Sequence, residues 1–366
     1  MTVQTEHRRQ NNKNKVDFTG EVIYIGIDAH GRSFEITIYY NGYEYKTFTQ
    51  DPEPYKLVRY LNKHFPGAGY NSVYEAGYCG YWIHDKLTIL GVENIVVNAA
   101  DVPLKDKEKK NKTDKVDSRR LARGLMNGDL SAIYIPTDKQ REDRTLVRSR
   151  YSFVQKQTRV KNQIKSFLAF YGIHITEEEG AKHWSNNYIR WLESLSIKHE
   201  SSKKALEMYL SELRHIKQII AEITRSIRLL GETYEYKKQV ELLTTVPGIG
   251  ILTAMILLTE IADIKRFNKF DHLCSYIGLV PTEHSSGEHI SRGDITPRRN
   301  RFLRHILIES SWVAVRKDPA LMLANRKYRS NGKNGPKAII KVARKLVSRI
   351  YQVLKNQRPY QLGIAN

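Results

Sequence analysis

The stretch NKTDKVDSRR (111–120) carries two carboxylates at a spacing suited to catalysis. Asp114 and Asp117 lie three residues apart, so a helix would present both on one face, and Thr113 is a suitable N-cap for that helix. The surroundings are basic, because eight Lys or Arg residues accompany four Asp or Glu residues between 105 and 120. The two aspartates therefore form either ordinary ion pairs on an exposed helix or part of a metal site.

Two further carboxylates lie at the ends of predicted strands. Asp28 ends VIYIGID (22–28), an apolar run typical of a buried strand, where a charge needs a partner. Glu75 lies near the end of NSVYEAG (71–77), which we interpret as another strand of the same sheet. If both converge with the aspartates of 111–120, the four carboxylates repel one another unless cations lie among them. Two Mg²⁺ ions ~4 Å apart would offset this repulsion and activate a phosphodiester.

The net charge points to a polyanionic partner. Sixty Lys and Arg residues against 39 Asp and Glu residues give +21, and clustered cations bind phosphates with release of counterions. A basic protein without such a partner, or one that binds anionic membranes, is the alternative. The predicted phosphate contacts nearest the aspartates are Lys112, Lys115, Arg119 and Arg120.

Composition also bounds the location. No apolar run approaches the ~20 residues that a membrane-spanning helix needs, and residues 1–16 read as a disordered basic tail, not a secretory signal. Cys79 and Cys274 are the only cysteines, too few for a disulfide framework or a Cys-rich zinc site. We expect a protein of the cytoplasm, with no membrane partner.

The elements that must position the carboxylates form an α/β domain over 17–135. The strand at 22–28 precedes two strand-like runs split by Asn41-Gly42, the strongest short hairpin signal. Alternating helix and strand signals follow, which predicts a mixed sheet with helices on its faces. The expected helices are 52–65 and 81–90, and the later strands are 71–77 and 93–99.

From Asp138 the strand signals stop, and 138–232 reads as a long helical, coiled-coil segment. Two apolar heptad series support it. Either an intramolecular helical hairpin or a dimerisation arm explains the pattern. The two series are Leu206, Leu213, Ile220, Ile227 and Tyr209, Ile216, Ile223, Leu230.

A mostly α-helical C-terminal domain is predicted over 233–366. Within LLTTVPGIGILTAMIL (242–257), two apolar helical halves flank a Gly-rich turn, which is typical of a helix-hairpin-helix. The backbone N–H groups of Gly248 and Gly250 could then approach a phosphate, although a simple tight turn explains the pattern nearly as well.

A loop rich in small residues is predicted within 276–307, followed by a basic helix start. Its serines, Ser285, Ser286 and Ser291, are hydroxyls that normally serve only in turns. The arginines suit bidentate phosphate binding. They are Arg292, Arg298, Arg299, Arg301 and Arg304.

The order Asp28, Glu75, Asp114-x-x-Asp117 resembles that of the DEDD transposases of the insertion sequence 110 family. The local contexts YIGIDAH, YEAGYCGYW and NKTDKVDSRRLA carry the resemblance, which extends over nearly the whole chain. It implies an N-terminal RNase H-like domain related to the RuvC Holliday-junction resolvases. It also implies that the four carboxylates are catalytic metal ligands for Mg²⁺.

The same resemblance assigns a role to one serine. The family places its nucleophile in a Ser-Gly after a G-L-x-P segment, here Gly278-Leu279-Val280-Pro281, so Ser286-Gly287 is the matching pair and the adjacent Ser285 the alternative. The implied reaction joins Ser286 to DNA as a phosphoserine. The family also works with a guide RNA encoded by its element, and we expect a homo-oligomer, a dimer or tetramer, that holds donor and target DNA.

Three functions fit these features. A transposase that uses the carboxylates and Ser286 is preferred. A metal-dependent, Holliday-junction resolvase-like nuclease would use the carboxylates without Ser286, and a protein-only DNA invertase would need no RNA. A catalytically silent nucleic-acid-binding protein is disfavoured by the presence of all four carboxylates.

Overall fold

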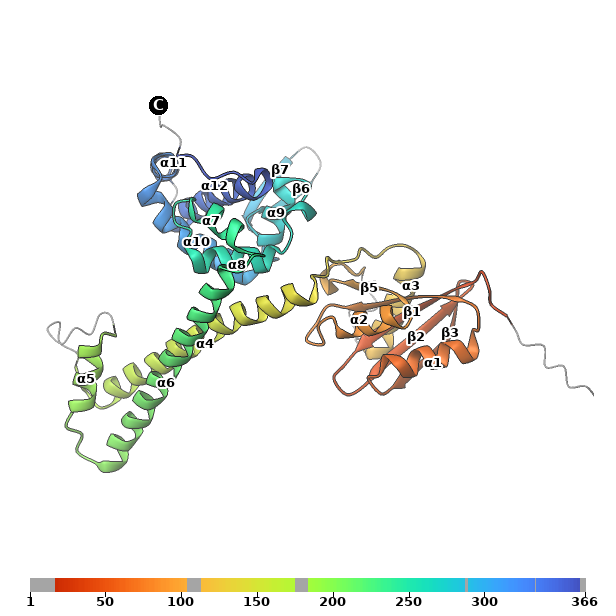
Figure 1. The fold of residues 1–366 in the computed structure, drawn as a ribbon, viewed down its shortest axis with the longest axis horizontal. Helices are drawn as coiled ribbons and strands as arrows, with labels where there is room; N and C mark the ends of the chain where they lie inside the picture. The colour runs from red at the N-terminus through yellow and green to blue at the C-terminus, as the bar shows by residue number, and fades with distance from the viewer. Residues whose placement is uncertain (1–16, 104–112, 175–183, 287–288, 333, 363–366) are drawn as a thin grey trace, which may run out of the picture. The chain divides into compact units, whose positions relative to one another are not determined.

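The computed structural model describes residues 17–103, 113–174, 184–286, 289–332 and 334–362, with side chains for all of these but 283–286 and 289–294. The chain divides into two compact units, Met1–Ile135 and Pro136–Asn366 (Figure 1). The predicted tail at 1–16 lies outside the described residues. The separation of 138–232 from 233–366 stays a prediction, because both belong to the second unit.

The first unit is built on a five-stranded mixed sheet, which confirms the predicted α/β fold. Its strand order is β3-β2-β1-β4-β5, with β1, β2 and β3 antiparallel and β1, β4 and β5 parallel. Asn41 and Gly42 both adopt a positive φ between β2 and β3, as a two-residue primed turn requires. The strands are β1 (Val22–Ala29), β2 (Phe34–Tyr40), β3 (Tyr43–Gln50), β4 (Gly69–Glu75) and β5 (Glu93–Val97).

Helices cover both faces of this sheet. On one face, Ile23, Ile25 and Ile27 of β1 form a core with α1 (Pro54–His64) and α2 (Trp82–Ile89). On the other face, a smaller core joins Val73 and Val97 to Leu121 of α3 (Asp114–Met126). A short 3₁₀ turn, η1 (Ala99–Asp101), follows β5. Side chains alternate along a strand, so every second residue of β1 and β4 faces α3.

The backbone of α3 lies almost directly on β1 at Gly26. A Cβ atom at this position would lie 2.1 Å from the carbonyl oxygen of Ser118 and 2.4 Å from the amide nitrogen of Ala122. Beside this contact, the buried hydroxyls of Ser118 and Thr37 hydrogen bond at 2.8 Å. Only glycine allows the helix to approach this closely, and Asp28 lies two residues further on the same face of the strand.

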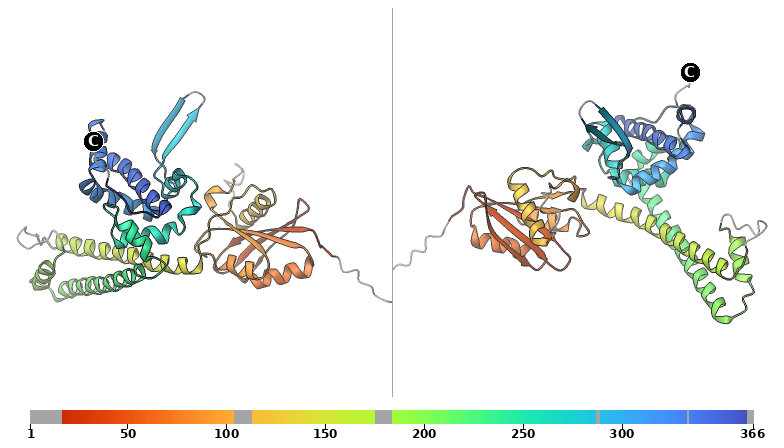
Figure 2. Two further views of the ribbon diagram at one scale, coloured as in Figure 1. Left: turned by 45° about the horizontal axis from the view of Figure 1, so that its top comes forward. Right: turned by 180° about the vertical axis from the view of Figure 1, so that it is seen from behind.

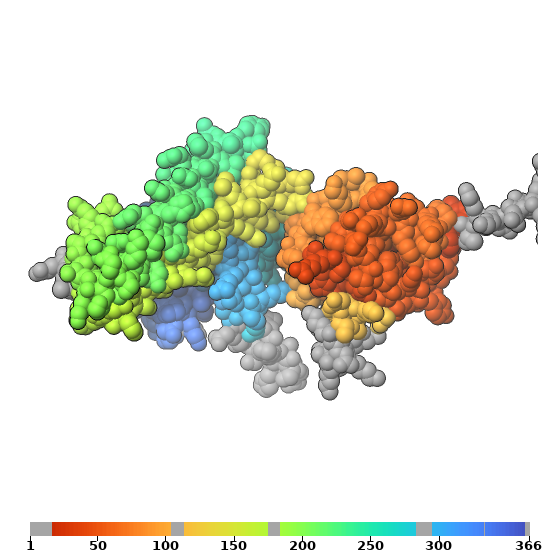
Figure 3. Space-filling model, turned by 90° about the horizontal axis from the view of Figure 1, so that it is seen from below, coloured from red at the N-terminus to blue at the C-terminus, as the bar shows by residue number. Residues whose placement is uncertain are grey.

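The second unit begins with two long helices that pack side by side (Figure 3). They are α4 (Asp138–Phe170) and α6 (Glu200–Gly231), with α5 (Asn186–Ser194) against their far ends. A capping box formed by Thr137 and Gln140 starts α4. The heptad positions of α6 thus serve an intramolecular hairpin, in which Leu206 and Leu213 are buried against Val160 and Ile164. The dimerisation arm stays a prediction.

The remainder of the unit is helical around one large core, as predicted. Its helices are α7 (Lys237–Thr244), α8 (Ile251–Ile261), α9 (Phe270–Ile277), α10 (Arg301–Lys317), α11 (Pro319–Ser330) and α12 (Gly335–Asn356), with the 3₁₀ turn η3 (Ile264–Arg266). The expectation that strands stop after Asp138 was wrong. A two-stranded antiparallel ribbon, β6 (Pro281–Ser286) and β7 (His289–Ile295), projects from the helices of its unit (Figure 2).

A fully buried carboxylate joins α4 to this core. Glu260 of α8 is 0% exposed and accepts two hydrogen bonds from Arg148 of α4, at 2.6 and 2.8 Å. Asn300, the N-cap of α10, donates a third at 2.9 Å. Burial raises the pKa of Glu260, but the hydrogen bonds and charge of Arg148 outweigh burial and leave this pKa lowered. The hydrogen bonds to this one carboxylate therefore hold α4, α8 and the start of α10 together.

Among the described residues, no helix has both the length and the apolar composition needed to cross a bilayer.

Replacing Gly26 with alanine should separate α3 from the sheet. We expect Gly26→Ala to destabilise the chain by about 1–3 kcal/mol, because the new methyl group overlaps the helix backbone. Thermal unfolding followed by circular dichroism measures this. Gly69→Ala is the matched control in β4, since its Cβ would lie at ordinary contact distance, 3.7 Å from the nearest atom. Equal melting temperatures for both variants would contradict the close contact.

Candidate metal centre

The first turn of α3 presents the two aspartates. As predicted, Thr113 is the N-cap, and its hydroxyl accepts a hydrogen bond from the amide of Val116 at 3.4 Å. Negative side chains in this first turn interact favourably with the positive end of the helix dipole. The Asp114 side chain is largely exposed, whereas Asp117 is 8% exposed and lies toward the sheet.

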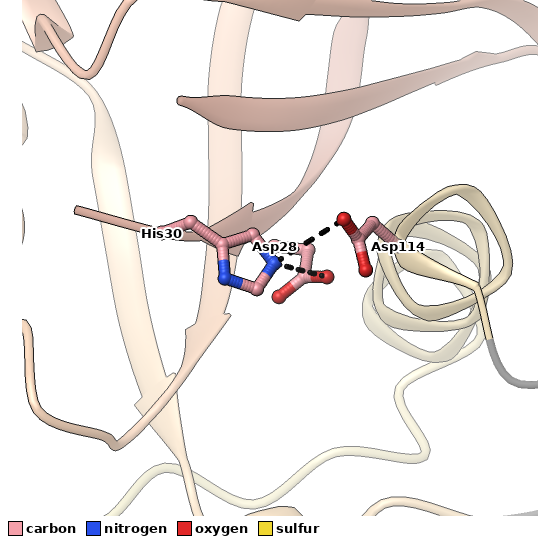
Figure 4. A group of neighbouring side chains, drawn as sticks. All are labelled: Asp28, His30 and Asp114. Carbon is pink, nitrogen blue, oxygen red and sulfur yellow. Dashed lines mark hydrogen bonds and ion pairs between the residues drawn. The ribbon is translucent and has the colours of Figure 1, made fainter. Parts of the chain in front are cut away.

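Asp28, His30 and Asp114 form a compact group at the end of β1 (Figure 4). Nε2 of His30 lies 3.2 Å from a carboxylate oxygen of Asp28 and 3.6 Å from one of Asp114. One ligand atom from each residue lies within 4.8 Å of the other two, so a single cation could contact all three. Carboxylate oxygens are the ligands that Mg²⁺ and Ca²⁺ prefer, and His nitrogen is tolerated by softer divalent ions.

The environment of Asp28 disfavours its negative charge. Burial raises the pKa of Asp28, the charges of Asp114 and Asp117 raise it further, and the hydrogen bond and charge of His30 oppose the shift without cancelling it. A cation would remove this repulsion. The residues present therefore fit a metal ion.

Glu75 and Asp117 are held together by Arg120. One guanidinium nitrogen of Arg120 lies 2.9 Å from a Glu75 oxygen and 3.1 Å from an Asp117 oxygen. The Arg120 side chain is 13% exposed, so it belongs to the site and not to an open surface. The sequence predicts a phosphate contact for Arg120, and in this structure its guanidinium binds two of the predicted metal ligands; the phosphate contact stays a prediction. All four predicted carboxylates thus gather at one end of α3.

The other cations predicted near the aspartates differ in position. Arg119 donates two hydrogen bonds to Glu44 of β3, at 2.6 and 2.9 Å, which directs it across the sheet. Lys115 is exposed on α3. Lys112 lies outside the described residues. The phosphate contacts of Lys112, Lys115 and Arg119 stay predictions.

Two site residues escaped sequence reasoning. His30 follows Asp28 at the two-residue spacing that places side chains on one side of a strand, and this signal was available. Glu35 is the cross-strand partner of Asp28, is 5% exposed and accepts a hydrogen bond from Thr49 at 2.5 Å. The other oxygen of Glu35 finds no hydrogen-bond donor among the described residues. Only the strand pairing reveals it as a fifth carboxylate on this face.

In the second unit, the predicted Gly-rich turn joins α7 to α8. Gly248 has a φ of +87°, and a Cβ there would lie 2.5 Å from the carbonyl oxygen of Ser310 in α10. Packing therefore explains Gly248 fully. Gly250 is the exposed N-cap of α8, and a Cβ there would meet no atom within 4 Å, so this side of the turn is open. Phosphate binding at the turn stays a prediction.

Four predicted arginines lie around the start of α10. Arg299 and Arg304 donate to the carbonyl oxygens of Pro297 and Thr296, at 3.1 and 2.9 Å, and Arg298 and Arg301 are exposed. Cations at a helix N-terminus add to its positive dipole, which makes this end favourable for an anion. The side chain of Arg292 is not described, although its backbone lies in β7.

Ser286 is the last residue of β6, and its Cα pairs with that of His289 in β7. The expected small-residue loop was therefore wrong in extent: Ser285 and Ser286 belong to a β-ribbon, as does Ser291. Their side chains, and Gly287, lie outside what the structure describes. The nucleophile assignment stays a prediction.

Two family models match the chain. The model DEDD_Tnp_IS110, described as a transposase, matches residues 25–173, which include all four carboxylates. The model described as the transposase IS116/IS110/IS902 family matches residues 240–326, which include Ser286.

Similar curated proteins are also transposases or DNA-inverting proteins by name. The chain is 31% identical over 239 residues to putative transposase y4qE of Sinorhizobium fredii, a match covering 65% of this chain and 57% of that protein. It is 24% identical over 349 residues to the transposase for insertion sequence element IS1533 of Leptospira borgpetersenii, covering 92% and 97%. Identity to the pilin gene-inverting protein of Moraxella bovis is 31% over 176 residues, covering 46% and 55%.

A mixed sheet with carboxylates gathered between β1, β4 and α3 defines an RNase H-like domain of the kind that processes nucleic-acid strands. The chain belongs to the insertion sequence 110 family of DEDD transposases, enzymes that cut and rejoin DNA. Membership implies a divalent metal ion, and Asp28, His30 and Asp114 form a group that fits one.

Removing the charge of Asp28 should stabilise the metal-free protein. Since its pKa is raised in the folded state, the carboxylate destabilises the fold at neutral pH, and this effect disappears as the pH falls below the usual carboxyl range. Asp28→Asn should therefore melt at a higher temperature than the wild type in EDTA, at neutral pH. Added Mg²⁺ should raise the melting temperature of the wild type more than that of the variant.

Asp129→Asn is the control, because Asp129 is an exposed aspartate beyond α3. Asp129→Asn should change neither the melting temperature in EDTA nor its increase on addition of Mg²⁺. A lower melting temperature of Asp28→Asn in EDTA would contradict the unfavourable charge of Asp28, and an undiminished response to Mg²⁺ would rule out the metal site described here.

Proposed function

We propose that this transposase cuts and rejoins DNA strands for insertion-sequence mobility, with Mg²⁺ at the carboxylate site and Ser286 as nucleophile. The gathering of Asp28, Glu75, Asp114 and Asp117 around the start of α3 is the observation that carries the proposal. Carboxylates this close have no structural need of one another, because each raises the cost of charging its neighbours.

The carboxylates are the proposed metal ligands. Bound Mg²⁺ supplies a Lewis acid for a phosphodiester oxygen. Asp28 and Asp114 already lie within reach of one cation, together with His30. Glu75 and Asp117 share Arg120, whose guanidinium balances one of their two negative charges and would have to release them for a second ion. A two-ion site therefore requires Arg120 to move, and its charge could then pair with the scissile phosphate.

Ser286 is the proposed nucleophile. Its Oγ would form a bond to phosphorus while the bond from phosphorus to one deoxyribose oxygen breaks, leaving a phosphoserine–DNA linkage and a free DNA hydroxyl. A serine hydroxyl is a weak nucleophile at neutral pH and needs activation by a base or a metal ion. The position at the end of β6 supports access, since the β6–β7 ribbon projects from its unit (Figure 2). The adjacent Ser285 is the alternative.

A guide RNA, a homo-oligomer and a location in the cytoplasm complete the proposal. The charge of +21 supports nucleic-acid partners of either kind. DNA inversion is the second candidate outcome, because the similar Moraxella bovis protein is named as gene-inverting. Inversion and transposition use the same strand chemistry and differ in the arrangement of the DNA ends.

The test of the nucleophile compares two neighbouring serines. We expect Ser286→Ala to reduce recombination of the element's own ends by roughly 1,000-fold or more, as removal of a nucleophile does. It should also abolish the covalent protein–DNA adduct, whereas Ser285→Ala keeps both. Junction sequencing from cells and a denaturing gel with labelled DNA provide the readouts.

Full activity of Ser286→Ala would transfer the role to Ser285 or, if strand cutting persists without any adduct, favour a hydrolytic resolvase-like reaction. Asp117→Asn is the companion variant. Recombination that survives Asp117→Asn would remove the carboxylate site from the mechanism.

The guide RNA is tested by co-purification. The protein is expressed with its native flanking non-coding DNA, purified, and the bound RNA is sequenced. We expect one discrete RNA from that flank, because a guide must be held through many phosphate contacts. A heterogeneous mixture, or no RNA even at low salt, would favour a protein-only recombinase.

A further inference from the structure

An exposed aromatic side chain lies beside the carboxylate site, and the proposed mechanism does not use it. Tyr78 follows Glu75 by three residues, in the segment between β4 and α2, and is 77% exposed. We propose that Tyr78 stacks on an unpaired base of the DNA strand whose phosphodiester lies at the carboxylates. This inference rests on the proposed function, because it requires DNA to reach the site.

The edge of the Tyr78 ring is fixed against the loop that follows β1. Its hydroxyl oxygen accepts a hydrogen bond from the amide of Gly31, the residue after His30. A Cβ at Gly31 would lie 3.3 Å from this oxygen and 3.5 Å from ring atom Cε2. The ring therefore lies along Gly31, one residue from the group formed by His30, Asp28 and Asp114. Most of its surface stays open to solvent.

A second aromatic residue borders the same loop. Trp82, the first residue of α2, is 43% exposed and packs on Phe34 with ring centroids 6.2 Å apart. Phe34 is the cross-strand partner of Ala29, the last residue of β1. Tyr78 and Trp82 thus both contact residues next to the end of β1; Phe34 belongs to the core beneath α1 and α2, so Trp82 borders this end from the face opposite to Asp28.

The chemistry of this border suits a nucleobase. Every base offers an aromatic face, so stacking on tyrosine or tryptophan binds single strands with little sequence preference. Within a duplex the bases already stack on one another, so the ligand must be unpaired or displaced from the stack. A base held by Tyr78 would fix the adjacent phosphate relative to the carboxylates, which is the positioning that strand transfer requires.

Photocrosslinking tests the contact directly. The full-length protein, with Ca²⁺ in place of Mg²⁺, is mixed with an oligothymidine of about 16 nucleotides in which thymine is replaced by 5-iodouracil. After irradiation, mass spectrometry locates the modified residues. We expect a crosslink on Tyr78. Modification of other residues with none between 76 and 82 would overturn the proposal.

Affinity measurements separate stacking from simple charge attraction. Tyr78→Ala should weaken binding of oligothymidine by about 5- to 100-fold, and Tyr78→Phe, which keeps the ring, should stay close to the wild type. Binding of an abasic strand of the same length should not change. Tyr43→Ala is the matched control, because Tyr43 is 79% exposed but begins β3 at the far end of the sheet.

The remaining outcomes also decide the question. An equal loss of binding to the abasic strand would mean that Tyr78 is only structural. A stronger Tyr78 crosslink to the matching oligouridine would assign the site to RNA and overturn the DNA assignment. If Asp117→Asn abolishes recombination while Tyr78 gives no crosslink, this inference alone fails. If Asp117→Asn recombines normally, the proposed function fails whatever Tyr78 contacts.

Discussion

The contact between α3 and β1 at Gly26 sets the spacing on which the candidate metal centre depends. With no side chain between them, the helix backbone lies on the strand, and the Ser118–Thr37 hydrogen bond fixes its lateral position. The first turn of α3 then lies over the end of β1, close enough for the charges of Asp114 and Asp117 to act on Asp28. A side chain at position 26 would hold these carboxylates apart.

Charge balance distinguishes this centre from the structural carboxylate of the second unit. Glu260 is fully buried, but Arg148 and Asn300 donate three hydrogen bonds to it, and its pKa is lowered. Asp28 is less buried, has fewer partners, and its pKa is raised. A satisfied buried charge holds helices together, whereas an incompletely balanced one retains affinity for a cation. The protein thus uses the same residue class for two purposes.

The second unit shows how far a repeat pattern alone can be interpreted. Part of the apolar heptad positions of α6 pack against α4 of the same chain, and this contact buries Leu206 and Leu213. Arg148 of α4 joins this helical hairpin to the C-terminal helices through its hydrogen bond to Glu260 of α8. In the proposed function, this unit meets DNA through the arginines around α10 and the projecting β6–β7 ribbon that carries Ser286.

The sequence by itself determined the features that depend on neighbours in the chain. These include the strands that carry Asp28 and Glu75 at or next to their last residue, the primed turn after β2, and the Thr113 cap, because local propensity and capping chemistry decide them. Only the tertiary structure decided that Arg120 binds Glu75, 45 residues away, and that Gly248 packs on α10. Both contacts depend on how distant segments pack, and no local pattern encodes them. The β6–β7 ribbon escaped notice for a different reason, because the small and polar residues of its two neighbouring strands resemble a loop.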